Sequence, residues 1–372
     1  MPLLGDMRPE TFYAEVWQRK GAVFRNAISG LAPVASGKLW SLAASGKTES
    51  RLIFEHGQDC PWQVEHGPLR RDASKCLPDE GWSLLIHEAD SHVPHVTKVL
   101  EHTSFMPRWL LDDVMISIAP TGGSVGPHID RYDAFLVQVA GRRRWQLEDT
   151  PREEDPVLVE GADLAVLADF APDRDYVLEP GDVLYVPPGL AHHGVALEEA
   201  QTWSIGLRAP SAHDLVLSYM EEVLDDLPFD ALYRAADLRA PGNQGELTPQ
   251  NIAAFREMLD HALQASHFES WLGRHLTRPR GANALGDAPD ADSLTSEHPP
   301  LELGPGVRSG YINHDDHSLE LFVDGDAFHI PASGAELARR LANGEPITDA
   351  GQCEETTRLL ASLHARGLLS ER

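Results

Sequence analysis

The sequence predicts a mainly β protein with α-helical additions, and three observations support this. Up to about residue 209, short apolar segments with β-branched and aromatic residues at near period two alternate with Gly, Pro and Asp. Many short strands with little helix between them are typical of a barrel or a sandwich. After residue 210 the apolar residues recur at helical spacing instead. The length of 372 residues indicates two or three domains.

The predicted β domain occupies the first 210 residues. Glu10–Arg19 has apolar or aromatic residues at helical spacing and predicts a short amphipathic helix, and Ala22–Phe24 predicts a strand. Further segments with the strand pattern are RLIFEH, WQVEH, WSLLIHE, VMISIAP, AFLVQVAG, RRWQLED, YVLEP, DVLYVPP and TWSIGLRAP. We expect all of them to form one domain over residues 1–210.

The rest of the chain divides into three predicted parts. Residues 211–280 contain AHDLVLSYMEEVLDDL and PQNIAAFREMLDHALQASHFESWLGRHL, which predict helices whose apolar faces form a homodimer. Residues 281–308 are rich in Gly, Pro, Ala and Asp without periodicity and predict a linker. Residues 309–372 combine a hairpin around Asp324 and Gly325 with two helices, which resembles a winged-helix module.

Charge and composition exclude several classes of function. The chain has 58 acidic and 31 basic side chains, a net charge of -27, which repels phosphate backbones and argues against direct nucleic-acid binding. No apolar segment approaches the roughly 20 residues of a membrane span, and the first ten residues lack the features of a signal peptide. Cys60, Cys76 and Cys353 are scattered, with no CxxC pair. We therefore expect a cytoplasmic protein without membrane contact, disulfides or a thiolate zinc site.

The segment GGSVGPHIDRYDAFLVQVAGRRRW carries the strongest chemical signal. If His128 to Asp130 is extended, both side chains point the same way, with Cα atoms roughly 6.5–7 Å apart. GDVLYVPPGLAHHGV offers another histidine after a strand and a Pro-Pro-Gly turn. Two histidines and one carboxylate on one face leave coordination positions open, as in the facial triad of non-haem Fe(II) oxygenases.

The identity of the second histidine stays open at this point. His192 and His193 are adjacent, and neighbouring residues of a strand face opposite sides, so only one of them can bind the same ion. We favour His192, the third residue after the glycine of the Pro-Pro-Gly turn. His193 is then expected at the rim of the pocket or in solvent.

These motifs resemble a known family. GPHIDRYDAFLVQVAGRRRW, SRLIFEHGQDCPWQVEHGPL, DDVMISIAPTGGSVGPH and GDVLYVPPGLAHHG are similar to the bacterial JmjC-type ribosomal oxygenases, from about Phe12 to Pro210. The resemblance implies a JmjC double-stranded β-helix, a cupin-like jelly roll, over residues 1–210. It also implies a helical dimerisation region and a C-terminal winged helix. This agrees with the predicted β domain, the helices of residues 211–280 and the hairpin with two helices of residues 309–372.

The resemblance also implies roles for single residues. His128, Asp130 and His192 would bind Fe(II), with no catalytic residue beyond this metal centre. Arg143 matches the family's basic residue for the distal carboxylate of 2-oxoglutarate, and an arginine fork suits that task. Strand alternation also separates Arg143 from its two arginine neighbours. Ser117 would assist 2-oxoglutarate, with an ordinary strand serine as the alternative.

The implied reaction is the 3-hydroxylation of an arginine in the 50S ribosomal protein L-sixteen, with Fe(II), 2-oxoglutarate and dioxygen. Asp133 and Tyr132 are candidates for substrate contact, and capping of the loop after a strand is their alternative role. Two other functions remain in view. One is the same chemistry on a histidine of another ribosomal protein or on another protein, including demethylation. The other is a cupin-like binding module without catalysis.

Overall fold

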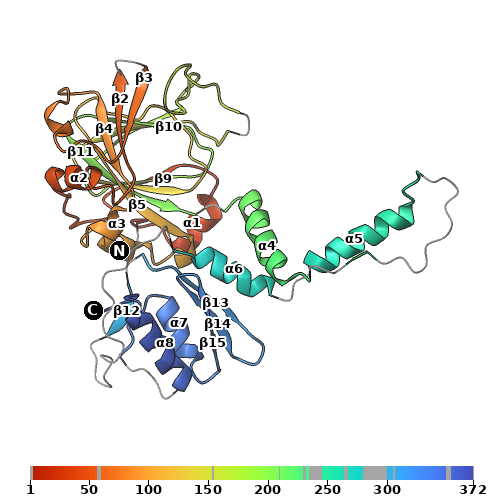
Figure 1. The fold of residues 1–372 in the computed structure, drawn as a ribbon. Coiled ribbons are helices and arrows are strands. Elements are labelled where there is room, and N and C mark those ends of the chain that lie inside the picture. Colours follow the sequence, from red (N-terminus) through yellow and green to blue (C-terminus); the bar gives the residue numbers. More distant parts are fainter. Residues whose placement is uncertain are drawn as a thin grey trace. The chain divides into compact units, whose positions relative to one another are not determined.

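The computed structural model divides the chain into two compact units, Met1–Ala209 and Pro210–Arg372 (Figure 1). The described residues are 3–56, 60–152, 155–208, 210–228, 232–233, 245–263, 267–279, 300–304, 306–348 and 353–371. Each unit is considered by itself below.

The first unit is built on a large antiparallel sheet. Its eight strands are, in order across the sheet, β1 (Ala22–Phe24), β9 (Val183–Val186), β6 (Ala134–Ala140), β11 (Ala200–Leu207), β5 (Leu111–Ala119), β4 (Trp82–Ile86), β2 (Ser50–His56) and β3 (Pro61–His66). A second sheet has three strands in the order β10 (His192–Ala196), β7 (Arg143–Leu147) and β8 (Arg174–Leu178). The predicted fold of many short antiparallel strands in a jelly roll is confirmed.

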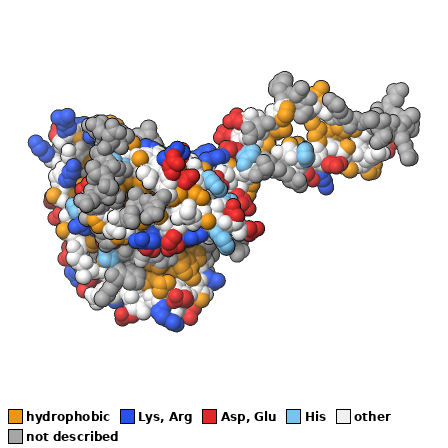
Figure 2. Space-filling view, turned by 90° about the horizontal axis from the view of Figure 1, so that it is seen from below, with side chains coloured by type: hydrophobic (Ala, Val, Ile, Leu, Met, Phe, Trp, Pro, Cys, Tyr) orange, Lys and Arg blue, Asp and Glu red, His pale blue; other side chains and the backbone are white. Residues whose placement is uncertain are grey.

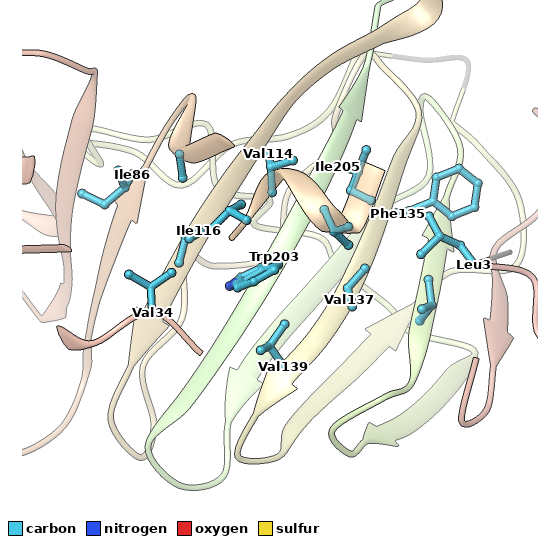
Figure 3. Close-up of a cluster of buried hydrophobic side chains, with 14 of the residues drawn as sticks. Leu3, Val34, Ile86, Val114, Ile116, Phe135, Val137, Val139, Trp203 and Ile205 are labelled. Carbon is cyan, nitrogen blue, oxygen red and sulfur yellow. The ribbon is translucent and has the colours of Figure 1, made fainter. Parts of the chain in front are cut away.

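One face of the large sheet packs on the hydrophobic core of this unit. Alternate residues of β5, β6 and β11 point to this face, among them Val114, Val137 and Trp203 (Figure 3). They pack with the N-terminal helices α1 (Pro9–Glu15) and α2 (Ser36–Ala43). Each such side chain contributes about 1.5–3 kcal/mol when fully buried. This core holds β5, β6 and β11 in place.

The opposite face of the large sheet carries polar side chains. Ser117 of β5 lies beside Thr202 of β11, which lies beside Gln138 of β6. All three are buried, and Thr202 Oγ1 donates a hydrogen bond of 2.9 Å to Gln138 Oε1. Buried polar side chains of this kind need partners, because an unpaired one costs the full desolvation of the group.

Short helices connect the strands of the first unit. They are α3 (Ala89–His92), η1 (Ala73–Lys75), η2 (Thr97–Thr103) and η3 (Arg108–Leu110). The N-terminal helix α1 ends at Glu15, earlier than the predicted Glu10–Arg19. A left-handed backbone at Gln18, with φ of 53°, turns the chain toward β1.

The second unit begins with helices. α4 (Ala212–Asp226) starts at a Ser211 cap, whose Oγ accepts a hydrogen bond of 3.0 Å from the Asp214 N–H. The second predicted helical segment forms two helices, α5 (Pro249–Leu263) and α6 (Phe268–Thr277). Among the described residues, no helix has the length and apolar character that a membrane span requires.

The C-terminal part of this unit is a small α/β structure. β13 (Ser309–Asn313), β14 (Leu319–Val323) and β15 (Asp326–Ile330) form one sheet, followed by α7 (Ala335–Ala342) and α8 (Glu354–Ala365). The hairpin turns at Asp324 and Gly325, as predicted. The helix α6 contacts this sheet, where Ser270 Oγ donates a hydrogen bond of 2.6 Å to Glu320 Oε1.

Part of the expected linker 281–308 is a strand, which corrects that expectation. β12 (Leu301–Leu303) pairs with β16 (Leu369–Glu371), and its two leucines are buried in the C-terminal core. The Leu-Glu-Leu alternation is a short strand signal that the surrounding Pro and Gly obscured. Residues 281–299 of the expected linker lie outside the described residues.

Candidate metal centre

Three side chains in the first unit converge on one point. His128, Asp130 and His192 each offer a ligand atom, and these atoms all lie within 4.8 Å of one another. Asp130 Oδ2 lies 3.9 Å from His128 Nε2 and 3.7 Å from His192 Nε2. This is the only such group of at least three His, Cys, Asp or Glu side chains in the described parts of the chain.

Backbone hydrogen bonds hold the two histidines together. The His128 N–H donates to the His192 carbonyl and the His192 N–H donates to the His128 carbonyl, both at 3.0 Å. The Asp130 carbonyl accepts a bond of 2.8 Å from the Gly189 N–H in the turn before β10. The ligand atoms are therefore placed by the protein backbone, although His128 and His192 are 64 residues apart in sequence.

Both imidazole rings are oriented by backbone carbonyls. His128 Nδ1 donates to the Gly126 carbonyl and His192 Nδ1 donates to the Leu190 carbonyl, each at 2.9 Å. A proton on Nδ1 leaves the lone pair of each Nε2 directed at Asp130, as in histidines that bind metals. Burial lowers the pKa of His192, which keeps this ring neutral and able to coordinate.

His193 faces away from this cluster. Its Nε2 lies 3.0 Å from the Oγ of Ser124, with which it forms a hydrogen bond. Burial lowers its pKa to about 4, so it too is neutral. His193 is half-buried and neither solvent-facing nor part of the metal cluster. Of the two histidines, the structure brings His192 to Asp130.

A buried cation lies on the same sheet as His192. Arg143 faces the interior from β7, is 5% exposed, and donates one hydrogen bond of 3.2 Å from Nη1 to Ser117 Oγ. Its Nε and Nη2 are buried without a hydrogen-bond partner in the part of the chain that is described. Burial lowers the pKa of Arg143 to about 10, so the group is still charged at neutral pH. A buried guanidinium with two unpaired nitrogens is costly and fits an anionic ligand.

The ring of Trp145 lies between the buried cation and the metal cluster. Its centroid is 5.9 Å from the guanidinium carbon of Arg143 and 5.9 Å from the ring of His192. Gly194 on β10 is directly opposite Trp145, and a Cβ there would lie 2.7 Å from the indole. The glycine thus makes room for the indole on the inner face.

Comparisons with known proteins agree with this geometry. The JmjC domain family matches residues 98–215, the range that contains His128, Asp130, Arg143 and His192. The ribosomal protein uL16 3-hydroxylase of Escherichia coli K12 is 32% identical over 363 residues, which cover 95% of this chain and 94% of that protein. The chain belongs to the JmjC-type ribosomal oxygenases.

Solved structures of this family are similar over the whole chain. The X-ray structure of Escherichia coli YcfD has a TM-score of 0.85 and 27% identity, with all of both chains covered. A structure of the ribosomal oxygenase YcfD in complex with cobalt and 2-oxoglutarate has a TM-score of 0.81 and 28% identity, with 98% of each chain covered.

The structure of this ribosomal oxygenase corrects one expected substrate contact. Asp133 is 2% exposed, and its carboxylate accepts hydrogen bonds from Gln18 Nε2, at 2.9 Å, and from the Tyr185 hydroxyl. These bonds hold the Asp133 carboxylate inside the protein. The alternative role, anchoring the chain after the ligand loop, fits the observed contacts. Tyr132, two residues after Asp130, is 40% exposed and stays a candidate.

Sequence reasoning missed several residues around the ribosomal oxygenase site. Ser124, Trp145 and Gly194 were not singled out, and the two carbonyls that orient the histidines cannot be read from side-chain identity. The available signals were the glycines at 126 and 194. Gly126 has φ of 80°, and glycine is the default residue at such positions.

Proposed function

We propose that this protein is an Fe(II)- and 2-oxoglutarate-dependent oxygenase that 3-hydroxylates an arginine of ribosomal protein uL16, called L-sixteen above. The observation that carries the proposal is the convergence of His128, Asp130 and His192 on the sheet face that also carries the unpaired Arg143. The uL16 3-hydroxylase and the complex with cobalt and 2-oxoglutarate support the same assignment. A binding module without chemistry has no use for this combination.

His128, Asp130 and His192 would hold Fe(II) through two Nε2 atoms and one carboxylate oxygen, which fits the facial triad. Bound iron would supply the reduction of dioxygen, coupled to oxidative decarboxylation of 2-oxoglutarate to succinate and carbon dioxide. The protein contributes placement: the hydrogen bonds to Gly126 and Leu190 fix both rings before any ligand binds. Placement of this kind is a large part of what enzymes provide for cofactor chemistry.

Arg143 and Ser117 are suited to bind the distal carboxylate of 2-oxoglutarate. Arg143 pairs with Ala196 across the sheet and is thus four residues along β10 from His192, roughly 13 Å between Cα atoms. Two long side chains reaching inward from these positions leave a gap that a short dicarboxylate can bridge. The free Nε and Nη2 of Arg143 offer the parallel donors of a bidentate pair.

On the substrate side, Tyr132 and Asp113 are the proposed contacts. Asp113 lies on the same face of β5 as Ser117, four residues toward the metal end of the strand. Its Oδ2 accepts a hydrogen bond of 2.9 Å from the Glu88 N–H, and its Oδ1 would be 3.2 Å from a Cβ on Gly206. A carboxylate here suits a guanidinium, and the net charge of -27 favours encounter with a basic ribosomal protein.

We further propose that residues 211–280 form a homodimer. In α5, whose 15 residues are all described, no side chain is buried, although Ile252, Phe255 and Leu259 form an apolar stripe. Figure 2 shows hydrophobic side chains at the surface of the chain. A single exposed helix of this length is marginal in water. A second copy presents the same stripe and covers it through an isologous contact.

The other predicted parts complete the proposal. Residues 1–210 are the catalytic domain, and 309–372 form a winged-helix-like C-terminal domain without a nucleic-acid ligand. Because the proposed substrate is a ribosomal protein, we place the enzyme in the cytoplasm.

Mass spectrometry of uL16 peptides tests the function. The protein is incubated with Fe(II), 2-oxoglutarate and an arginine-containing uL16 peptide, with a lysine-substituted peptide and a histidine-containing ribosomal peptide as controls. We expect a mass gain of one oxygen atom at the arginine and stoichiometric succinate. Modification of the histidine peptide alone would reassign the substrate, and the absence of succinate with every peptide would reject the enzyme.

A further inference from the structure

His193 is hydrogen-bonded to a residue 69 positions earlier in the chain, Ser124, with 3.0 Å between Nε2 and Oγ. The position of this contact has a consequence for the metal centre, although His193 itself is not part of it. We propose that His193 is a positioning residue that orients the His128 ring through Ser124 and Gly126, and so sets metal affinity. This inference rests on the proposed function, because it assumes that His128 binds a metal.

The first step runs from Ser124 to His128. The Ser124 Oγ accepts a hydrogen bond of 3.0 Å from the Gly126 N–H. The carbonyl of Gly126 in turn accepts the bond of 2.9 Å from His128 Nδ1 that directs Nε2 toward Asp130. Three consecutive hydrogen bonds therefore connect the imidazole of His193 with that of His128.

The second step is the rigidity of the residues between them. Ser124 is buried, and its carbonyl accepts a hydrogen bond of 3.1 Å from Ser83 Oγ on β4. Gly126 has φ of 80°, and a Cβ there would lie 2.9 Å from Val166 and 3.2 Å from Trp62. The N–H and the carbonyl of Gly126 belong to two successive peptide units joined at its Cα, and the close neighbours of this Cα restrict rotation between them, so the position of the N–H influences the direction of the carbonyl.

The third step is that β10 holds the segment from Ser124 to His128 at both of its ends. His192 bonds the backbone of His128, and the next residue, His193, bonds the side chain of Ser124. The adjacent histidines have different tasks on opposite faces of one strand. Loss of the His193–Ser124 hydrogen bond leaves the backbone bonds between His128 and His192 in place, but it weakens the hold on the Gly126 N–H and lets the Gly126 carbonyl change direction. The loss of an outer partner of a metal ligand commonly lowers metal affinity by about 10–100-fold.

Two substitutions separate the hydrogen bond from packing. His193 also contacts the ring of Phe170, with 6.1 Å between ring centroids. His193→Phe keeps a ring there without the hydrogen bond, whereas His193→Gln places an amide near the position of Nε2 and keeps the bond. Ser124→Ala removes the bond from the other side. Ser218→Ala is the matched control, because Ser218 Oγ bonds His275 Nδ1 at 3.0 Å in the second unit.

The readouts are calorimetric titration with Co(II), the visible spectrum of the bound Co(II), and the thermal unfolding midpoint of the metal-free protein. We expect the affinity for Co(II) to fall about tenfold in His193→Phe and in Ser124→Ala. This is the lower end of the usual range, because the effect reaches His128 only through Ser124 and Gly126. The Co(II) spectrum should change in both. His193→Gln and Ser218→Ala should stay within about twofold of wild type, and Ser124→Ala with His193→Phe should be no weaker than either alone.

Each result decides the question. Unchanged affinity and spectrum in His193→Phe and Ser124→Ala, with a wild type that binds Co(II), would overturn the inference and leave the proposed function intact. The same holds if His193→Gln is as weak as His193→Phe. A wild type that binds no Co(II) would remove the metal centre and this inference together. If His193→Phe fails to fold, Ser124→Ala, which removes a single buried oxygen, decides alone.

Discussion

Arg143 on β7 donates a hydrogen bond of 3.2 Å to Ser117 on β5, and this contact joins the inner faces of the two sheets. The remaining donors of the guanidinium, Nε and Nη2, have no acceptor among the residues that the structure describes. A fixed, buried and incompletely paired cation is therefore present before a ligand arrives. Its placement near the metal centre gives a direct test of the cosubstrate assignment.

Arg143→Met should separate stability from ligand binding. Removal of an unpaired buried charge is expected to raise the free energy of unfolding of the ligand-free protein by about 1–3 kcal/mol. The affinity for 2-oxoglutarate should fall at least about a hundredfold, because charged hydrogen bonds to its carboxylate are lost. Thermal unfolding with and without 2-oxoglutarate measures both effects. Arg144→Ala, which changes the exposed neighbour paired with Asp175, should leave the ligand-induced shift unchanged.

Asp130 and Asp133 should respond in opposite ways to the loss of charge. Asp130→Ala removes a ligand atom, so Co(II) affinity should fall by more than about a hundredfold, with little change in the unfolding of the metal-free protein. Asp133→Asn should keep metal affinity and lose about 1–3 kcal/mol of stability, because its bonds to Gln18 and Tyr185 are impaired. Equal Co(II) binding by wild type and Asp130→Ala would refute the metal assignment.

The pH dependence of stability should also report on Asp133. Burial raises the pKa of this carboxyl, and the hydrogen bonds from Gln18 and Tyr185 only partly oppose the effect. A folded-state pKa above the unfolded value means that the folded protein retains the proton longer, so stability falls as pH rises through this range. In urea unfolding from about pH 4 upward, wild type should lose more stability than Asp133→Asn. Parallel curves would contradict the predicted ionisation.

Gly194→Ala should disturb the site through Trp145. The added Cβ would lie 2.7 Å from the indole, and such overpacking typically costs about 1–3 kcal/mol. Because the indole touches both ends of the site, we also expect weaker Co(II) and 2-oxoglutarate binding. Gly37→Ala in α2 meets nothing within 4 Å and should be neutral or stabilising by about 0.5–1 kcal/mol. Calorimetry and urea unfolding of both variants provide the comparison.

Leu259→Glu tests the proposed dimer. Leu259 is 63% exposed in a single chain, and a charge in a covered apolar stripe is strongly disfavoured. Light scattering after size-exclusion chromatography should give the mass of a dimer for wild type and of a monomer for Leu259→Glu. Val157→Glu changes an equally exposed residue of the first unit, 60% exposed, and should remain a dimer. A monomeric wild type would end this part of the proposal.

Strand periodicity predicted a barrel or a sandwich for the first unit, and the resemblance to the ribosomal oxygenases added the jelly roll and most of the site roles. Periodicity placed His128 and Asp130 on one side, and it separated Arg143 from Arg144, as the structure shows. Periodicity gives only the face of a side chain, however. It does not give the residue that a side chain contacts on another strand, because that depends on the register between strands that are distant in sequence.

The roles of Asp133 and His193 depend on partners that are distant in sequence, whereas β12 was missed because it is short. Asp133 was a candidate for substrate contact because it follows the ligand pair, with loop capping as the alternative, and its bonds to Tyr185 of β9 and to Gln18 favour the alternative. The role of His193 depends on Ser124, far away in sequence. β12 was hidden because a three-residue strand has too little alternation to be distinguished from a loop.

The mutual backbone bonds of His128 and His192 mean that the ion is not needed to assemble its own ligands. These two bonds do not involve the ligand atoms, so one divalent ion can replace another while the backbone pairing of the two histidines stays the same.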